Sequence, residues 1–546
     1  MNQPTQEFHA IAEAVLADLL AADPVAATWL GDHAHDRELP DLTDNAVSAR
    51  AMRIDDHLTA LDAVDDVELD VADFVDLEIL RSALTKAAFD DTELREQTWN
   101  PMAWNPGTAL HLLLSRDFAP LADRLESAIG RLSEIPRFLA DARATLQEMP
   151  EIHVETALSQ FAGARALIEG QLVPLLTDNG MSNAQATTAM AAIDDFTAWL
   201  GEQLPVSRKD PRLGERLYSA VLWHRLDDGT TPGSLLEDAH ANLELVSEQI
   251  REVACEYLGE TGRDVVERAL AQVANDFPVT NDTVLALVEA ANARSRDFTI
   301  AHDLVWVPEI DVRVIEMPEI HRGVAVAYCD APGPLETAPV PTFVAVSPTP
   351  ADWSPERVDS FYREYNGVQL HDLTVHEAFP GHVLQLAHAR ALKAASPVRK
   401  FGMSGVFVEG WAVYAEQLMI NRGYTPTDDP RSALAIRLQQ LKMQLRMTIN
   451  AILDVGVHAG DMTEDEGLAL MRDRGFQEEG EAVGKWRRAL LTSGQLPTYF
   501  VGYKAVTEIS NDLRVLHADW NDRQVHDLML SQGSPAPRHL RTLLGI

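Results

Sequence analysis

Apolar residues recur at helical spacing over most of the first 300 positions of the chain. In residues 8–20, and again in residues 121–132, apolar side chains fall at i, i+3, i+4 and i+7, which places them on one face of an amphipathic helix. Gly, Pro and Asp gather between such runs, and Thr231 to Ser234 precede another long run in the manner of a helix start. The pattern predicts a mostly helical segment over residues 1–300.

A different pattern occupies residues 301–350, where short β-branched runs are separated by prolines. Such runs are typical of strands in a small sheet, and they cover residues 312–315, 323–328 and 342–346. The last run has two interpretations: an exposed edge to which an extended peptide could add as a further strand, or a strand internal to the sheet. Helical spacing returns from residue 354 onward.

Neither a fixed-period repeat nor a long low-complexity linker interrupts these segments. We therefore expect one large helical body rather than a string of independent domains. Its parts are a helical lobe over residues 1–300, a small β-sheet insertion over residues 301–350, and a second helical lobe over residues 351–546 that forms one cooperative unit with the first.

The composition is that of a globular and strongly acidic protein. The 546 residues are 46% hydrophobic, and 45 Lys and Arg against 84 Asp and Glu give a formal net charge of −39. Nucleic acids and anionic membranes bind basic patches, so neither is expected as a partner.

Cysteines and apolar stretches restrict the location and the kind of metal site. Cys255 and Cys329 are the only cysteines, which excludes a disulfide framework and a cysteine-based zinc site. The N-terminus lacks a basic region followed by an apolar core, and no stretch of about 18 uncharged apolar residues occurs. These absences favour a cytoplasmic location.

Two histidines and a glutamate lie within seven residues, in His376-Glu377-Ala378-Phe379-Pro380-Gly381-His382. In the His-Glu-x-x-His pattern of zinc hydrolases the histidines lie four apart, share one helix face and converge on one metal. Here they lie six apart. Six residues of helix turn through roughly 600°, which leaves the second imidazole about 120° away from the first. A regular helix therefore cannot form this site.

Pro380 and Gly381 indicate how the chain solves the spacing. Proline lacks an N–H and clashes with the carbonyl four residues earlier, here that of His376, so the helix must break or bulge. A local bulge that absorbs two residues returns His382 to the face of His376, and Gly381 allows the backbone angles that a bulge needs. We predict a distorted helix over Phe379–Gly381 with both histidines directed at one metal. The other interpretation is two ordinary histidines on a kinked helix.

A third ligand is expected, because catalytic zinc takes three protein ligands and leaves a position open for water. Residues 405–418 predict a helix that is apolar nearly all round, with Glu409 and Glu416 seven apart on one face. Buried carboxylates are costly unless a cation or metal neutralises them. We assign Glu409 as the third ligand and Glu416 as an acceptor that orients a histidine N–H. Arginine pairing or an exposed helix edge would explain both residues without a metal.

Glu377 is the natural general base of such a site, because it neighbours a ligand and need not bind the metal itself. Negative charge that develops on a substrate carbonyl requires a donor. Tyr499 and Tyr503 are candidates, four apart on a predicted helix that Pro497 begins. Either tyrosine could equally belong to the core or the rim.

Three further residues are candidates for supporting roles. Arg446 and His458 lie in another largely apolar run, where Arg446 could bind a substrate carboxylate or neutralise one of the two glutamates. Asp372, just before the metal motif, is a candidate for orienting a ligand.

These residues resemble the bacterial family known as domain of unknown function 885, whose members look like zinc peptidases with a His-Glu-x-x-Pro-Gly-His motif. The resemblance is carried by four blocks in order, with weaker echoes at residues 24–42 and 218–235; the blocks are residues 373–385, 409–416, 454–458 and 494–502. Phe500 departs from the lysine that we expect there.

The family is similar in turn to helical gluzincin peptidases of the thimet-oligopeptidase and thermostable-carboxypeptidase type, in which helical lobes enclose a deep cleft with zinc at its floor. The resemblance implies a mainly α fold, a large two-lobed helical body around a deep cleft, with a small β-sheet beside the metal-binding helix. It implies His376, His382 and Glu409 as ligands, Glu377 as base and a late tyrosine as oxyanion donor.

The sequence thus predicts a metallopeptidase with one Zn²⁺ per chain that hydrolyses short peptides in an enclosed cleft, through a zinc-bound water activated by Glu377, as a carboxypeptidase or dipeptidase. One alternative keeps the metal and changes the substrate to a non-peptide amide or an ester. Another is a non-catalytic helical binding protein whose metal is structural or absent. The sequence indicates no oligomeric state.

Overall fold

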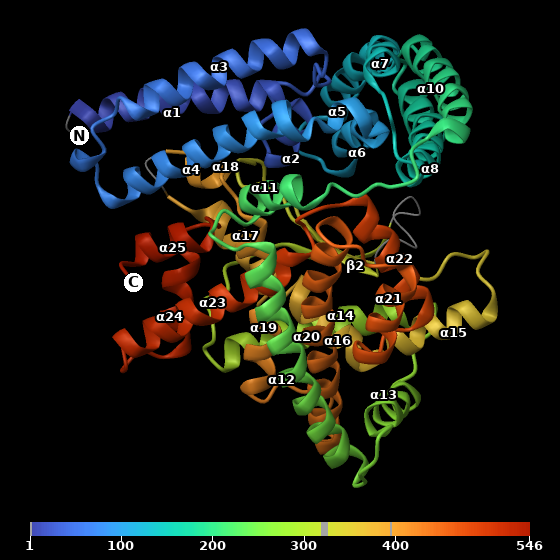
Figure 1. The fold of residues 1–546 in the computed structure, drawn as a ribbon, viewed down its shortest axis with the longest axis vertical. Helices are drawn as coiled ribbons and strands as arrows, with labels where there is room; N and C mark the ends of the chain where they lie inside the picture. The colour runs from blue at the N-terminus through green and yellow to red at the C-terminus, as the bar shows by residue number, and fades with distance from the viewer. Residues whose placement is uncertain (1–2, 318–325, 394–395) are drawn as a thin grey trace. The chain divides into compact units, whose positions relative to one another are not determined.

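The described residues are mainly α-helical with one small β-sheet, which confirms the predicted mainly α fold (Figure 1). The two lobes around a deep cleft stay a prediction. The computed structural model describes residues 3–317, 326–393 and 396–546. The chain divides into two compact units, each with its own hydrophobic core. The first unit comprises Met1–Pro211, Pro332–Val340 and Ala394–Gly402, and the second comprises Arg212–Ala331, Pro341–Lys393 and Met403–Ile546. The predicted domain ranges 1–300, 301–350 and 351–546 stay predictions.

The regular elements of the first unit, among its described residues, are helices, and one isolated β-bridge joins Pro150 and Arg208. The helices α7, α8 and α10 pack on one another around its core. Its helices are α1 (Gln3–Ala22), α2 (Pro24–Leu30), α3 (Asp44–Asp62), α4 (Val71–Phe89), α5 (Glu96–Trp99), α6 (Gly107–Ser115), α7 (Leu121–Thr145), α8 (Glu151–Leu167), α9 (Val173–Asp178), α10 (Ala184–Gln203) and α18 (Val398–Phe401).

Segment 332–340 packs within the first unit against the end of α2. A Cβ on Gly333 would lie 2.2 Å from the carbonyl carbon of Leu30, so this approach requires glycine. The imidazole of His33 contacts the Glu336 carboxylate at 2.9 Å. These contacts give a structural role to the sequence around residues 26–33.

The second unit carries the metal motif. Its long helices α12 and α20 run side by side (Figure 1), and α12 begins at Pro232 as predicted, with the Thr231 side chain accepting from the Ser234 N–H at 3.1 Å. The helices are α11 (Glu215–Leu226), α12 (Pro232–Leu258), α13 (Val265–Asp276), α14 (Val284–Ala301), α15 (Pro355–Glu364), α16 (Gly367–Glu377), α17 (His382–Ala391), α19 (Gly405–Asn421), α20 (Pro430–His458), α21 (Glu464–Ala469), α22 (Glu479–Leu491), α23 (Pro497–Leu516), α24 (Asp522–Leu530) and α25 (Pro537–Leu544).

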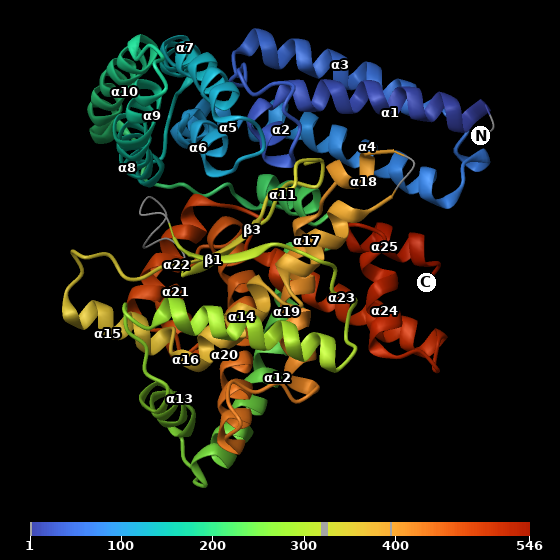
Figure 2. The same ribbon diagram turned by 180° about the vertical axis from the view of Figure 1, so that it is seen from behind.

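The small sheet has the strand order β1-β3-β2, and Figure 2 shows β1 and β3 side by side. Strands β1 (Val312–Glu316) and β3 (Thr342–Val346) pair in parallel, β2 (Ala327–Asp330) pairs antiparallel to β3, and α14 packs on the sheet. Because β3 has a partner on each side, the interpretation of this strand as an exposed edge is wrong. Of the predicted strand 323–328, residues 323–325 lie outside the described residues.

Packing in the second unit brings the two helices that carry the motif, α16 and α17, together with α19 and α20. Helix α16 contacts both α19 and α20, and α17 contacts α19. The start of α16 is fixed by Asn366, whose side chain accepts from the N–H groups of Val368 and Gln369 at 3.2 and 3.1 Å.

Among the described residues, no helix combines the length and the apolar composition that crossing a membrane requires.

Candidate metal centre

The helix that carries the first histidine ends between the two histidines. Helix α16 ends at Glu377 and α17 begins at His382, so the predicted distortion is a break rather than a bulge. The Phe379–Pro380 peptide bond is cis. The Pro380 carbonyl accepts a hydrogen bond from the indole N–H of Trp411 at 2.8 Å, and Trp411 is fully buried on α19. The break is therefore anchored to the helix that carries Glu409.

Gly381 is needed for space and not for a left-handed backbone. Its φ is −71° and its ψ is −133°. The backbone is therefore not left-handed, while this ψ lies outside the α and β regions that other residues prefer, as expected of a glycine at the distortion. A Cβ at this position would lie 1.9 Å from the carbonyl oxygen of His376 and 2.4 Å from that of Val375. The N–H of Gly381 donates to this Val375 carbonyl at 3.1 Å. The chain thus folds back onto the end of α16, which brings His382 close to His376.

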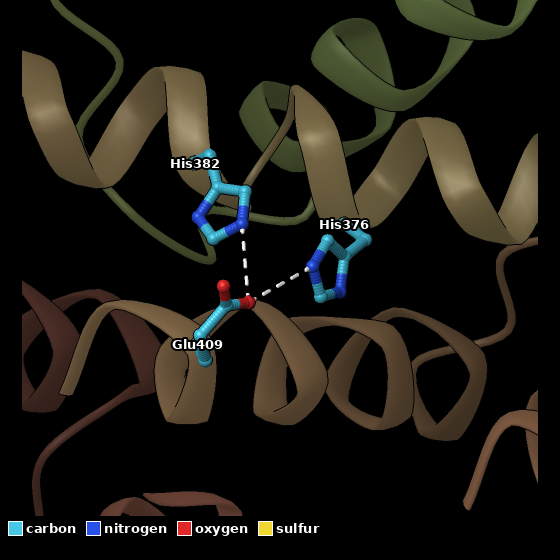
Figure 3. A group of neighbouring side chains, drawn as sticks. All are labelled: His376, His382 and Glu409. Carbon is cyan, nitrogen blue, oxygen red and sulfur yellow. Dashed lines mark ion pairs between the residues drawn. The ribbon is translucent and has the colours of Figure 1, made fainter. Parts of the chain in front are cut away.

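His376, His382 and Glu409 meet at one place (Figure 3). One nitrogen or oxygen of each lies within 4.8 Å of the others. The Nε2 atoms of His376 and His382 lie 3.5 and 3.6 Å from Oε2 of Glu409, and the two imidazole planes are nearly perpendicular at 87°. The side chains come from α16, α17 and α19, and they enclose a common point as metal ligands do.

Glu416 determines which nitrogen of His376 faces that point. Its Oε1 lies 2.7 Å from Nδ1 of His376, so Nδ1 carries the proton and donates to it, and Nε2 presents its lone pair to the ligand group. Burial lowers the pKa of His376. Its contacts with Glu409 and Glu416 raise the pKa by more than burial lowers it, so the net shift is well upward. A proton therefore competes with a metal for Nε2.

The chemistry of the three side chains fits a divalent cation. Two imidazole nitrogens and one carboxylate oxygen form a donor set that zinc prefers. Oε2 of Glu409 is buried and accepts no hydrogen bond, although both imidazoles approach it. Burial alone would raise the pKa of Glu409, yet its contacts with the two histidines hold it far below the ordinary value. A buried, ionised oxygen without a donor is what a cation would neutralise.

Glu377 lies buried beside this group but is not a member of it. Its Oε2 accepts from the backbone N–H of Cys329 on β2 at 2.9 Å. Burial raises the pKa of Glu377, and the nearby imidazoles of His376 and His382 oppose that rise only in part. The carboxylate is thus fixed next to the ligands with an increased affinity for protons.

The two tyrosines occupy different environments on α23. Tyr499 accepts from the side-chain amide of Gln495 at 3.4 Å; burial raises its pKa, and the negative charge of Glu409 raises it further. Its own O–H donates to no described residue. Tyr503 donates to Oε1 of Gln417 at 2.7 Å, so its proton is already used. The geometry therefore favours Tyr499 as the oxyanion donor.

Tyr499 approaches Glu409 because α19 and α23 cross in backbone contact. A Cβ on Gly502 would lie 2.0 Å from the Val406 carbonyl oxygen, and one on Gly410 would lie 2.3 Å from the Gly502 carbonyl carbon. Tyr499 lies one turn before this crossing on its helix.

Arg446 neutralises carboxylates other than the two that the sequence suggested. It pairs closely with Glu481, approaches Glu364 at 3.8 Å and donates to the Tyr365 hydroxyl at 3.2 Å. No ion pair joins it to Glu409 or Glu416 among the described residues. The interpretation of Arg446 as the partner of those two glutamates is therefore wrong, and its role as a substrate ligand stays a prediction.

The structure places His458 and Asp372 in supporting positions that differ from each other. His458 Nε2 donates to the carbonyls of Ala489 and Thr492, each at 2.9 Å, away from the three ligands. Asp372 lies one turn before His376, fully buried, and neither of its oxygens accepts a hydrogen bond. Burial and the nearby Glu416 raise its pKa well above the ordinary value.

Sequence reasoning missed four residues that shape the site: Trp411, which anchors the break; Cys329, whose N–H holds Glu377; and the glycine pair Gly410 and Gly502. The tryptophan and both glycines lie in the blocks that carry the family resemblance. A conspicuous Gly-Trp pair beside a proposed ligand was the available signal. Cys329 gave none, because its contribution is a backbone N–H.

The sequence profile described as "Bacterial protein of unknown function (DUF885)" matches residues 24–544. No curated protein matches the chain. Among solved structures, a "putative lipoprotein of unknown function" from Shewanella oneidensis superposes with a TM-score of 0.83 at 27% identity, over 99% of this chain and 100% of that one. A "putative lipoprotein" from Colwellia psychrerythraea gives 0.80 at 14% identity, over 99% of each chain, and shows the same fold.

A carboxypeptidase from Deinococcus radiodurans gives a TM-score of only 0.41 at 12% identity, over 100% of this chain and 95% of that one. A similarity at this level carries no argument about fold or activity. The cytoplasmic location of this protein likewise stays a prediction.

Proposed function

The chain belongs to the family of bacterial proteins of unknown function DUF885, and we propose that it is a zinc-dependent metallopeptidase that hydrolyses short peptides. One observation carries the proposal. The ligand atoms of His376, His382 and Glu409 lie within 4.8 Å of one another, while Glu377 is held beside them by the Cys329 N–H and stays outside the group. Three protein ligands with a carboxylate at hand are typical of catalytic zinc sites, whereas structural sites have four protein ligands.

Each nearby side chain has a chemical task in this proposal. When bound, zinc supplies Lewis acidity, which activates an attacking water and polarises a carbonyl. Glu377 accepts the proton of that water and releases it to the leaving amine, for which its raised pKa is suited. Tyr499 donates its unused O–H to the carbonyl oxygen of the substrate, where negative charge develops. Glu416 keeps His376 in the tautomer that binds metal.

Metal analysis and peptide-library cleavage test the proposal together. We expect one zinc per chain in protein reconstituted with zinc, and cleavage of short peptides. Glu377→Gln should retain zinc and lose activity by about 10²- to 10⁴-fold, the usual contribution of a general base. Glu508→Gln, a change at an exposed position of α23, is the matched control and should cleave normally.

The outcomes separate this proposal from its alternatives. Unchanged cleavage by Glu377→Gln would exclude Glu377 as the base. Glu377-dependent hydrolysis of esters or non-peptide amides, with no peptide cleaved, would identify the metal-dependent hydrolase of another substrate class. Zinc bound without any hydrolysis, or no zinc taken up at all, would leave the non-catalytic binding protein.

A further inference from the structure

A cluster of buried charges on α15, α20 and α22 contains more cations than carboxylates. Two carboxylates, Glu364 and Glu481, each have a cation close by: Lys442 Nζ lies 2.9 Å from Glu364, and Arg446 pairs with Glu481. The next carboxylate, Glu478, is paired with Arg363 at 2.9 Å. The negative charge of the cluster is thus already compensated.

Lys485 adds a further cation to this cluster. Its side chain is 7% exposed, and it makes no hydrogen bond or ion pair with any residue that the structure describes. Burial lowers its pKa to about 7, and the charge of Arg446 lowers it as well. The charges of Glu481 and Glu364 oppose this lowering only in part. A buried ammonium that makes no direct ion pair is unfavourable in the folded state, so we expect the lysine at this position to serve another purpose.

Arg488 lies one turn after Lys485 on α22 and connects the cluster to the metal centre. Its Nη2 donates to Oε1 of Gln495 at 2.7 Å, and the amide of Gln495 donates to the Tyr499 hydroxyl at 3.4 Å. Gln495 is neutral, so the charge of Arg488 is also uncompensated by a carboxylate. Tyr499 in turn is close enough to Glu409 to sense its charge.

Lys485 and Arg488 lie one helical turn apart and neither makes an ion pair with a described carboxylate. Arg488 also connects through Gln495 to the proposed oxyanion donor, so the two cations form a site for an anion. We propose that Lys485 and Arg488 bind the free C-terminal carboxylate of a peptide substrate, which makes the enzyme a carboxypeptidase. This inference rests on the proposed peptidase function. Arg488 supplies a planar pair of donors and Lys485 a point charge, a combination that holds a carboxylate in one orientation.

The same two residues fill the role that the sequence suggested for Arg446. Arg446 is buried among Glu364, Glu481 and Tyr365 and has no charge to spare. It fixes the carboxylates of the cluster instead, which leaves Lys485 and Arg488 as the cations that a substrate can neutralise.

Binding to the metal-loaded Glu377→Gln protein tests the proposal without requiring turnover. We compare an N-acetylated dipeptide with a free C-terminal carboxylate and its C-terminal carboxamide by titration calorimetry. The acid should bind roughly 10- to 100-fold more tightly, as charge-assisted hydrogen bonds in a protein site do. Adding Arg488→Met should bring the ratio of the two affinities close to one, because it removes the donors that bind the carboxylate. Arg488 is exposed, so the fold should tolerate the change.

Lys485→Met provides a second, independent readout. It should reduce the same acid-to-amide ratio while raising the midpoint of thermal unfolding, because it removes an unpaired buried charge. A lysine with a purely structural role would lower the midpoint and leave the ratio intact. Arg472→Met, which removes an exposed arginine paired with Glu479, is the control and should change neither quantity.

Three results would overturn the proposal: equal binding of acid and amide before any substitution at α22, a ratio that survives both substitutions, or inorganic phosphate binding that matches the acid in affinity and in its loss on Arg488→Met. A preference for the acid that appears only in peptides ending in Glu, and not in those ending in Gln, would also contradict the proposal, because the site would then recognise the side chain and not the C-terminal carboxylate. Failure of the peptidase proposal shows separately, as no cleavage of either peptide by the zinc-loaded wild-type protein.

Discussion

At the scale of single residues, Glu416 controls the state of a proposed metal ligand from outside the ligand group. Its carboxylate accepts from Nδ1 of His376 at 2.7 Å, which leaves Nε2 as the only lone pair of that imidazole. Without this acceptor the proton is free to move to Nε2, which cannot then bind a metal.

Glu416→Met, which keeps the volume and removes the acceptor, should weaken zinc binding by about 10- to 100-fold. Competition with a calibrated zinc chelator measures this affinity. Glu256→Gln, at an exposed position of α12, should leave it unchanged. Wild-type affinity in Glu416→Met would show that the hydrogen bond does not prepare His376 for a metal.

Gly381→Ala tests the space requirement at the break between α16 and α17. The new Cβ would lie 1.9 Å from the His376 carbonyl oxygen, so His382 must shift. We expect the free energy of unfolding to fall by about 1–3 kcal/mol and the bound zinc to fall well below one per chain. Gly480→Ala has no neighbour within 4 Å and should raise the stability slightly. Full zinc content in Gly381→Ala would contradict the geometry.

At the scale of elements, the crossing of α19 and α23 brings the ligand helix to the helix of Tyr499. The two backbones touch because Gly410 and Gly502 have no side chains. Small residues at a crossing permit the shortest distance between helix axes, and any added atom forces the helices apart.

Gly502→Ala should therefore move Tyr499 away from the metal centre. We expect the rate of peptide cleavage to fall by about 10- to 100-fold, while zinc stays near one per chain because no ligand lies on α23. Steady-state kinetics beside elemental analysis measures both quantities. Gly484→Ala on α22, with nothing within 4 Å, is the control. An unchanged rate would show that the crossing does not position Tyr499.

Local sequence patterns predicted the helices well, but they could not predict which strands and charged side chains pair over long distances in the chain. Helical spacing, Thr231 as a cap and Pro497 as a start correspond to observed helices, because spacing and caps act within a few residues. The central place of β3 depends on strands that precede it in the chain. Likewise, the partners of Arg446 come from α15 and α22, and no local pattern identifies them.

At the scale of the whole molecule, stability depends on pH through a histidine that is buried neutral. His526 donates from Nδ1 to the Leu304 carbonyl at 2.7 Å and accepts at Nε2 from the Tyr414 hydroxyl at 2.8 Å. A second proton, on Nε2, would face the positively charged guanidinium of Arg514 at 3.4 Å. Burial lowers the pKa of His526 to about 4, whereas in the unfolded chain it is about 6.5.

Because the folded pKa is the lower one, the unfolded state binds more protons between pH 6.5 and pH 4. The contribution of His526 is complete above pH 6.5 and is lost as the pH falls through this window. The stability advantage of wild type over His526→Gln should shrink by up to about 2 kcal/mol between pH 7 and pH 5. Chemical denaturation at both pH values measures it. His240→Gln, exposed on α12, should show no such change, and a constant advantage would contradict a neutral His526.

The division of the chain into units could not be predicted from its sequence. Segments 332–340 and 394–402 belong to the first unit although the residues around them belong to the second. The contacts that place them there, such as Gly333 against Leu30 and Arg399 with Asp76 at 2.9 Å, join residues hundreds of positions apart. The metal motif was predictable because its chemistry lies within seven residues.

The central claim is that His376, His382 and Glu409 bind one catalytic metal ion. Anomalous scattering at the zinc absorption edge, from crystals of the zinc-loaded protein, tests it most directly. We predict one zinc per chain, about 2.0–2.2 Å from Nε2 of each histidine and from a carboxylate oxygen of Glu409, with Glu377 not coordinated. Zinc bound at other residues, a fourth protein ligand that closes the site, or no zinc at these three side chains would contradict the claim.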